Sequence, residues 1–153
     1  MARFTLSFES EVRASPEESW TWVTSVAGIR AEMRPLARMT MPRGIESILD
    51  VDFELGTPLF RSWLLLFGIL PIERSDLTLI ELTEGRGLVE ESPMLMMRLW
   101  RHERRIDPVD GGSRITDVLT FEPRVGGRLV ERCVETFFRH RHRVLRRALG
   151  TRS

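Results

Sequence analysis

The residues with the clearest chemical potential are a histidine and an aspartate on two neighbouring segments of alternating apolar residues. The segments 99–106 and 114–122 flank a stretch rich in proline, aspartate and glycine, residues 107–112, which is typical of a β-hairpin. A hairpin symmetric about its centre pairs His102 with Asp117. The carboxylate would hold the imidazole in one tautomer and raise its pKa, as a general base requires. The same pair could instead satisfy a half-buried histidine with no catalytic role.

The predicted pairing also defines which residues share a face of the hairpin. Trp100 lies opposite residue 119, and Arg104 lies opposite residue 115 in this register. A shift by one residue would separate the histidine from the aspartate entirely. The face that carries the pair is expected to contain Trp100, His102, Arg104, Ile115, Asp117, Leu119 and Phe121.

Two adjacent glutamates, Glu90 and Glu91, stand near the end of another predicted strand, residues 88–92. Neighbouring side chains in a strand point to opposite faces, so one glutamate should face the interior of the sheet. An inward carboxylate close to Arg98 or Arg104 would form a buried ion pair. Such a pair could orient a polar group of a ligand or simply neutralise itself.

Two apolar stretches are candidates for contact with a ligand or a partner. Met94, Met96 and Met97 form a soft patch that either adapts to apolar ligands or fills gaps against the last helix. The segment 59–70 reads as one long strand that is apolar on both faces, so one face should line the interior and the other should meet a partner chain or a covering segment. Its two faces carry Trp63, Leu65 and Phe67 on one side and Phe60, Leu64 and Leu66 on the other.

Helices are predicted near both ends of the chain. Ser15 and Glu18 form a capping box around Pro16, which predicts a short helix to about residue 25 and a second one over 29–33. Helical spacing of apolar residues predicts a long helix over 127–149. The expected strands cover residues 3–13, 36–41, 59–70, 76–83, 88–92, 99–106 and 114–122.

The order of these elements predicts an α+β fold in a single domain, residues 1–153. A curved antiparallel sheet with one apolar face must be covered, and one long amphipathic helix can lie across its concave side. Space left between the sheet and the helix would form a cavity for a small molecule. The basic end of the helix, with His140 and His142 among arginines, complements the helix dipole or contacts an anionic partner. Positions two apart diverge on a helix, so these histidines are not expected to bind a metal.

Composition narrows the function further. The 153 residues carry a formal net charge of +1, which argues against a dedicated nucleic-acid binder. All 23 basic residues are arginine, which reflects either codon bias or recognition of anions and carboxylates. The single cysteine excludes an internal disulfide, and the apolar run 63–72 is about half the ~20 residues of a membrane-spanning helix. No secretory leader opens the sequence, so we expect a cytoplasmic protein with no cofactor, no metal and no integral membrane association.

Four local sequences resemble the START and birch-pollen-allergen superfamily, also called SRPBCC. They are ASPEESW at residues 14–20, WRHE at 100–103, GGSRITD at 111–117 and FRHRH at 138–142. The resemblance covers nearly the whole chain and implies the helix-grip fold. It departs at Leu95 and Met96, where relatives often carry Gly-Pro before the tryptophan strand. The superfamily includes lipid carriers and polyketide cyclases, so the fold does not decide the function.

Three functions remain open from the sequence. The protein binds a small apolar or amphipathic molecule, such as a lipid, polyketide or aromatic metabolite, between the sheet and the last helix. Alternatively, it is an enzyme of the cyclase or dehydratase type, with His102 as the base and Asp117 as its partner. The third possibility is a non-enzymatic subunit that binds a partner protein and whose cavity is filled by its own side chains. A homodimer is also possible. The predicted ligand-binding residues are Trp63, Leu65, Glu90, Met94, Met97, Trp100, His102, Asp117, Leu119 and Phe137.

Overall fold

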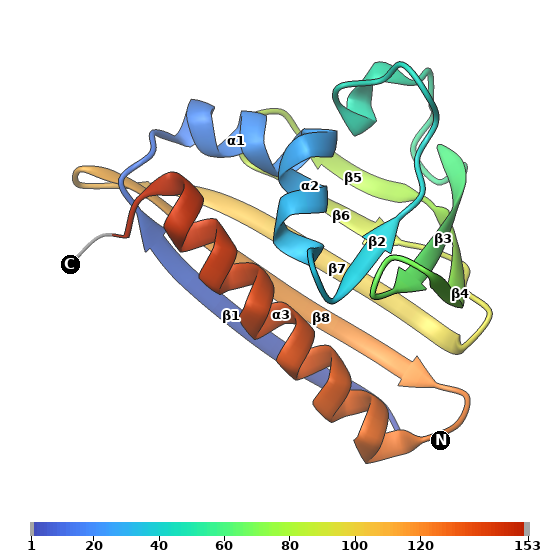
Figure 1. Ribbon diagram of the computed structural model, residues 1–153. Helices are drawn as coiled ribbons and strands as arrows, with labels where there is room; N and C mark the ends of the chain where they lie inside the picture. Colours follow the sequence, from blue (N-terminus) through green and yellow to red (C-terminus); the bar gives the residue numbers. More distant parts are fainter. Residues whose placement is uncertain (1, 152–153) are drawn as a thin grey trace.

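The computed structural model describes residues 2–151 of the chain (Figure 1). A five-stranded antiparallel sheet has the order β1-β8-β7-β6-β5, and a separate three-stranded sheet has the order β2-β3-β4. The elements are β1 (Phe4–Val12), α1 (Pro16–Thr24), α2 (Val26–Met33), β2 (Ala37–Met39), the 3-10 turn η1 (Ile48–Asp50), β3 (Phe60–Leu66), β4 (Leu70–Leu77), β5 (Leu79–Thr83), β6 (Gly87–Glu91), β7 (Met97–Val109), β8 (Gly112–Pro123) and α3 (Gly127–Leu149).

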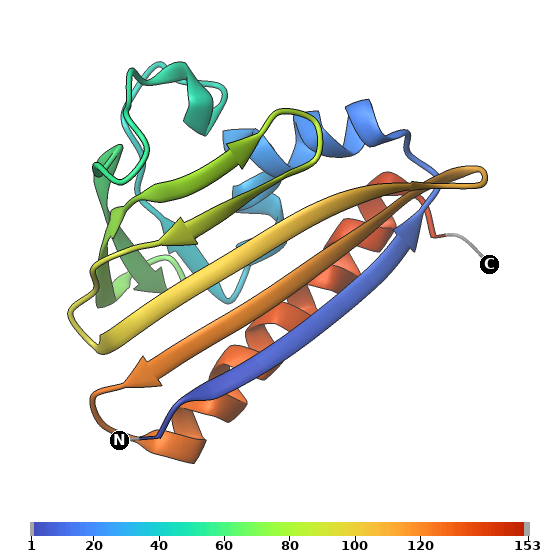
Figure 2. The same ribbon diagram turned by 180° about the vertical axis from the view of Figure 1, so that it is seen from behind.

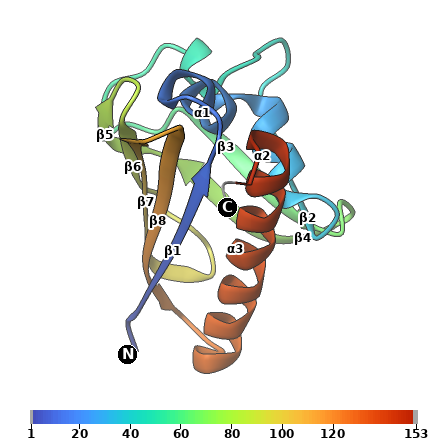
Figure 3. The same cartoon turned by 90° about the vertical axis from the view of Figure 1, so that its left-hand side faces the viewer.

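The long helix α3 lies lengthwise along one face of the larger sheet, over β1 and β8 (Figure 1). Seen from the side, the sheet and α3 form two layers, and α1 and α2 close one end between them (Figure 3). No helix or strand of residues 2–151 lies over the opposite face of the sheet (Figure 2). The arrangement confirms the predicted α+β helix-grip fold, with two short helices after the first strand. Within residues 2–151, no helix combines the length and apolarity that crossing a membrane requires.

The N-terminal elements form as their sequence predicts. Ser15 accepts a hydrogen bond from the Glu18 backbone at 3.1 Å, and the Glu18 carboxylate accepts one from the Ser15 backbone at 3.2 Å, which completes the capping box of α1. A second serine, Ser25, caps α2 through the backbone of Gly28 at 2.9 Å. A Cβ atom on Gly28 would overlap the Trp22 carbonyl oxygen. Glycine therefore permits α2 to lie tightly against α1.

The predicted strand 59–70 is wrong, because the chain turns back within it. Phe67 and Gly68 both have positive φ, 54° and 80°, and they form the turn of the β3–β4 hairpin. The predicted strand 76–83 is also wrong, because Thr78 divides it between β4 and β5, which belong to different sheets. The Thr78 backbone donates to the Ser92 hydroxyl at 3.0 Å, so at this point a side chain replaces the strand partner.

The register predicted for the β7–β8 hairpin is wrong by two residues. His102 pairs with Leu119, and Arg104 pairs with Asp117. The strands extend further than expected into the stretch 107–112, and only Asp110 and Gly111 form the turn. An even shift of register leaves every side chain on its predicted face, so the histidine and the aspartate still face the same side.

Two apolar clusters lie at different levels along α3. Phe138 packs with Leu119 and Phe121 at one level. Leu145 packs at the other level, where its buried neighbours are Val12, Ala14, Val23, Ile106 and Ile115. Arg141 and His142 are also buried and lie between these levels on the helix. The polar layer that they enter separates the two apolar clusters.

Candidate functional site

A fully buried carboxylate, Asp117 on β8, is the centre of the polar layer. Its Oδ1 accepts hydrogen bonds from His102 Nε2 at 2.6 Å and from Arg104 Nε at 2.7 Å. Its Oδ2 accepts from Arg104 Nη2 at 2.8 Å and from His142 Nε2 at 2.7 Å. Four donors from β7 and α3 therefore surround one acceptor, and each carboxylate oxygen receives two of them.

Arg104 links this aspartate to a second buried carboxylate, Glu32 on α2. Its Nη1 and Nη2 donate to the two Glu32 oxygens at 3.0 and 2.9 Å. Both carboxylates thus receive two hydrogen bonds from one planar guanidinium, which is the pairing geometry that arginine favours. The three side chains are at most 3% exposed, so these pairs lie out of contact with solvent.

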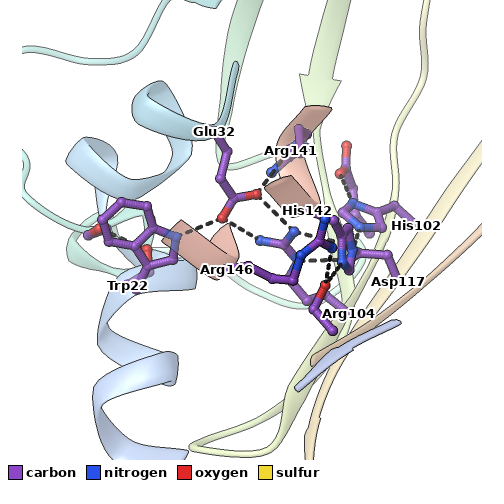
Figure 4. Close-up of polar contacts among 11 residues, drawn as sticks. Trp22, Glu32, His102, Arg104, Asp117, Arg141, His142 and Arg146 are labelled. Carbon is purple, nitrogen blue, oxygen red and sulfur yellow. Dashed lines mark hydrogen bonds and ion pairs between the residues drawn. The ribbon is translucent and has the colours of Figure 1, made fainter. Parts of the chain in front are cut away.

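Glu32 also joins three helices through the same carboxylate (Figure 4). Trp22 on α1 donates its indole N–H to Oε2 at 2.8 Å, and Arg141 on α3 donates Nε to Oε1 at 3.0 Å. The Arg141 guanidinium also lies over the Phe138 ring, 4.9 Å from its centroid, where a cation–π interaction stabilises it. Two buried arginines and two buried carboxylates give this part of the network no net charge.

His142 extends the network from α3 to β1. Its Nε2 donates to Asp117, and its Nδ1 lies 2.7 Å from the Ser10 hydroxyl. Because an ionised carboxylate only accepts, Nε2 carries a proton, and in the neutral tautomer Nδ1 accepts the hydroxyl proton of Ser10. Ser10 in turn accepts from Arg146 Nη1 at 3.0 Å. The terminal helix is therefore anchored to the sheet by polar contacts as well as by packing.

His102 and Glu90 form the less buried edge of the network. Their side chains are 8% and 13% exposed, whereas the Asp117 side chain has no exposure. His102 Nδ1 lies 3.8 Å from Glu90 Oε1, which is too long for a direct hydrogen bond. The other Glu90 oxygen accepts from the Ser92 hydroxyl at 2.6 Å. One carboxylate oxygen of Glu90 is thus fixed, and the other faces the imidazole across a gap.

The charges of the network shift its pKa values in opposite directions. Burial disfavours ionisation of Asp117, but Arg104 and His102 outweigh it and hold the pKa of Asp117 well below its ordinary range. Burial likewise opposes ionisation of Glu32, whose pKa is nevertheless lowered by Arg104 and Arg141. Burial disfavours the charged form of His102, yet the adjacent Asp117 carboxylate raises the pKa of the imidazole above its ordinary value.

The structure brings several of the predicted site residues together. The His102–Asp117 pair forms as expected, although the two residues are diagonal rather than directly opposite. Glu90 is the inward glutamate, but the expected pairing with Arg98 or Arg104 is wrong, because its neighbours are His102 and Ser92. The remaining predicted residues on this side of the sheet and helix are Met97, Trp100, Leu119 and Phe137, all members of or packed against one apolar cluster.

Three predicted ligand residues lie elsewhere. Trp63 is 41% exposed on β3, and the inward-packed residues of that strand are Phe60 and Leu64. Leu65 stands at a β-bulge on the same strand, where the alternation of faces is interrupted. Met94 forms an isolated bridge with β4 outside the larger sheet. The hairpin that replaces the predicted strand 59–70 explains their separation from His102.

Glu32, Arg141 and His142 also belong to the site, although they are not among the predicted site residues. A signal for the two α3 residues was present, since they fall three and four positions after Phe138 and therefore on its face of the helix. Glu32 follows Ile29 by three positions on the buried face of α2. A polar residue on the apolar face of a helix indicates that it has a buried partner, and this criterion identifies Glu32, Arg141 and His142.

Neither of two cavities that open on the described part of the chain lies between the larger sheet and α3. Direct contacts occupy that region, among them the ring contact of His102 with Phe138 at 5.2 Å. Trp100 and Phe138 also meet there, with ring centroids 6.4 Å apart. The space predicted beneath the helix is therefore occupied by side chains at this level.

Comparison with known proteins agrees with the observed fold. A family model described as Domain of unknown function (DUF8410) matches residues 10–149, and none of the curated proteins matches the chain. Protein CV1439 from Chromobacterium violaceum is similar at a TM-score of 0.72 and 14% identity, covering 97% of this chain and 98% of that chain.

Two further solved structures are similar over nearly their whole lengths. A START superfamily protein from Mycobacterium smegmatis has a TM-score of 0.65 and 13% identity, covering 95% of this chain and 96% of that chain. The Zhui aromatase/cyclase from Streptomyces sp. R1128 has a TM-score of 0.60 and 14% identity, covering 97% and 98%. At these identities the similarity establishes the fold, which is that of the START and birch-pollen-allergen superfamily.

Replacing Glu32 with glutamine should destabilise the protein strongly. The substitution keeps the shape of the side chain but leaves the charges of Arg104 and Arg141 under-compensated in the interior. Loss of one partner of a buried ion pair costs about 3–5 kcal/mol, which urea unfolding would measure. The matched control is Glu122→Gln, whose exposed pair with Arg3 should contribute less than about 1 kcal/mol. Equal effects of the two substitutions would contradict the prediction.

Stability should decline at both ends of the pH range. The lowered pKa values of Asp117 and Glu32 stabilise the fold above about pH 4 and cease to do so as the pH falls through their folded values. The raised pKa of His102 stabilises the fold below about pH 6.5, and this contribution disappears as the pH rises through the folded value. Urea unfolding of the wild type and His102→Gln should therefore differ more at about pH 5.5 than at about pH 9. A difference that grows with pH would refute this assignment.

Proposed function

This chain belongs to the DUF8410 family, and from its helix-grip fold and its buried network we propose that it binds a small amphipathic molecule at the edge formed by His102 and Glu90. The observation that carries the proposal is the 3.8 Å gap between His102 Nδ1 and Glu90 Oε1. A ligand hydroxyl beside this pair, at hydrogen-bond distance from both atoms, would donate to the carboxylate and accept from the imidazolium.

The apolar part of the ligand would contact side chains next to this gap. Trp100 is the next inward-facing residue of β7 before His102, and it is only partly buried. Met97 and Phe137 lie in the same cluster and are also partly buried. None of the three is held by a side-chain hydrogen bond among the described residues, so they can move to admit a ligand at the cost of packing alone. Flexible methionine and flat aromatic side chains suit an apolar molecule of varied shape.

The likeness to an aromatase/cyclase supports a small-molecule role for a chain of this fold. Binding is favoured over the cyclase or dehydratase alternative because of the charge state of His102. Nε2 donates to Asp117, which leaves Nδ1 as the nitrogen that could accept a proton, but Nδ1 faces the Glu90 carboxylate at 3.8 Å. Against the effect of burial, the two carboxylates raise the pKa of His102 and favour a protonated Nδ1 that donates a hydrogen bond. The Asp117 carboxylate then serves as a positioning group that orients His102.

Naphthol, a hydroxyl on a flat apolar body, is a suitable probe of this site. We expect it to raise the melting temperature of the wild type with increasing concentration. Glu90→Gln should weaken binding about tenfold or more, because a hydrogen bond to a charged group contributes about 1.5–3 kcal/mol. Trp100→Ala should also weaken it, whereas Trp63→Ala, the same change on the exposed side of β3, should not.

The binding proposal would fail if naphthol shifted the melting temperature equally in the wild type and in Trp100→Ala. Native mass spectrometry of the purified protein gives an independent check. A co-purifying small molecule that is lost in Trp100→Ala and kept in Trp63→Ala would support the site, and one that is kept in both variants would place the ligand elsewhere.

Self-association is a second candidate function, and the β3–β4 hairpin favours it. The hairpin exposes large apolar side chains that the fold itself leaves uncovered, and Ile69 is 82% exposed. Exposed apolar side chains gathered on one hairpin are typical of surfaces that meet a partner. Those that exceed 40% exposure on this hairpin are Trp63, Phe67, Ile69, Leu70 and Ile72.

A second copy of the chain is the partner that this hairpin would meet. Sedimentation equilibrium of the wild type should show a concentration-dependent dimer, and the double variant Ile69→Glu with Ile72→Glu should stay monomeric. Leu55→Glu places the same charge at an exposed apolar residue away from the hairpin and should leave the dimer intact. A wild type that is monomeric at all concentrations would exclude this candidate.

A further inference from the structure

A cavity of about 390 Å³ lies outside the polar layer, where α2 ends and the chain leads into β2. Phe67 and Gly68, in the turn of the β3–β4 hairpin, form part of its lining. It shares no lining residue with the proposed site at His102 and Glu90. Its lining residues are Arg30, Arg34, Pro35, Ala37, Arg38, Phe67 and Gly68.

The charge of this lining is unbalanced. Three arginines surround the cavity, and no aspartate or glutamate lines it. No ion pair or side-chain hydrogen bond joins any of the three to a described residue, whereas Arg104 and Arg141 in the core are both paired. The Nε atom of Arg30 is buried and has no hydrogen-bond partner among the described residues. A buried guanidinium N–H without a partner costs free energy, and an anion in the cavity would remove that cost.

The β3–β4 turn, which lines part of the cavity, has a backbone conformation that only a few residue types favour. Phe67 has a φ of 54°, in the left-handed region that a bulky residue seldom adopts. Its backbone N–H donates to the Leu36 carbonyl at 2.8 Å, which ties the turn to the segment between α2 and β2. On the other side, His140 of α3 lies 2.7 Å from the Arg34 carbonyl oxygen through Nε2. Backbone held in such a conformation often occurs at binding sites.

A second cavity shows that this arrangement is distinctive. It has a volume of about 180 Å³ beside the β5–β6 turn. Its lining contains two arginines, Arg86 and Arg105, and two acids, Glu81 and Asp107, so the formal charges of the lining cancel. Of these two cavities, the one beside α2 has an excess of positive charge in its lining, which favours binding of an anion.

We propose that the cavity formed by Arg30, Arg34 and Arg38 binds a phosphate monoester. A phosphate monoester carries a charge close to −2 at neutral pH, and its three terminal oxygens can each accept from guanidinium N–H groups. Three arginines without ion-pair partners suit a dianion with three acceptor oxygens better than they suit a carboxylate, which has one negative charge and two oxygens. The exposed Phe67 ring at the rim can then contact the organic group of the ester. The phosphate can come from a free metabolite or from the headgroup of a lipid.

Isothermal titration at low ionic strength tests the site with phenyl phosphate and inorganic phosphate, and with acetate as the monoanionic comparison. Both phosphates should bind the wild type more tightly than acetate does, and added NaCl should weaken them. Arg34→Ala with Arg38→Ala should raise the dissociation constants at least tenfold, and both side chains are exposed enough for the fold to tolerate the change. The matched control is Arg128→Ala, an exposed arginine in the first turn of α3 that should bind as the wild type does.

Vesicles of phosphatidylcholine with and without phosphatidic acid distinguish the two sources of phosphate. Co-sedimentation with phosphatidic acid vesicles that the double variant loses would assign the site to a lipid headgroup. Phosphate binding without vesicle binding would assign it to a soluble phosphate ester. Equal phosphate affinities of the wild type and the double variant, or no phosphate binding by the wild type, would overturn the proposal. Naphthol binding measured on the same double variant reports separately on the site at His102.

Discussion

The structure depends on one guanidinium held between two carboxylates. Arg104 donates two hydrogen bonds to Asp117 and two to Glu32, and all three side chains lie in the interior. Burial of any one of these charges alone would be strongly unfavourable. The sheet, through Arg104 and Asp117, and the short helix α2, through Glu32, must therefore be in place together. This mutual requirement adds to the apolar packing of Val23 and Ile29 and holds the two short helices in a fixed position at one end of the sheet.

The same network fixes the rotation of the terminal helix. Apolar packing alone constrains a helix loosely, because neighbouring apolar residues of similar size can replace one another. Arg141 and His142 each have a defined acceptor, on α2 and β8 respectively. A rotation by one residue would direct the exposed Arg143 toward Asp117 and would break both contacts. The polar layer thus specifies one arrangement of α3 on the sheet.

The general architecture followed from the sequence because its signals are local. Alternation in β1, the capping box at Ser15 and the periodicity of α3 each lie within one segment, and all three appear as predicted. The errors arose where a contact between distant segments decides the outcome. Thr78 divides the predicted strand 76–83 because Ser92, fourteen residues later, accepts a hydrogen bond from its backbone N–H. The partner of Glu32 is 72 positions away along the chain, which no spacing rule reveals.

The order of the elements along the chain has a consequence for biosynthesis. Arg141 and His142 belong to the final helix, whereas Asp117 and Glu32 precede it. As the nascent polypeptide leaves the ribosome, the hairpin of β7 and β8 emerges while the residues that complete its charged interior are still inside the exit tunnel. Until α3 emerges, the carboxylates of Asp117 and Glu32 lack two of their partners and stay hydrated. Emergence of this helix, rather than the appearance of the sheet, is then the event that completes the charged interior.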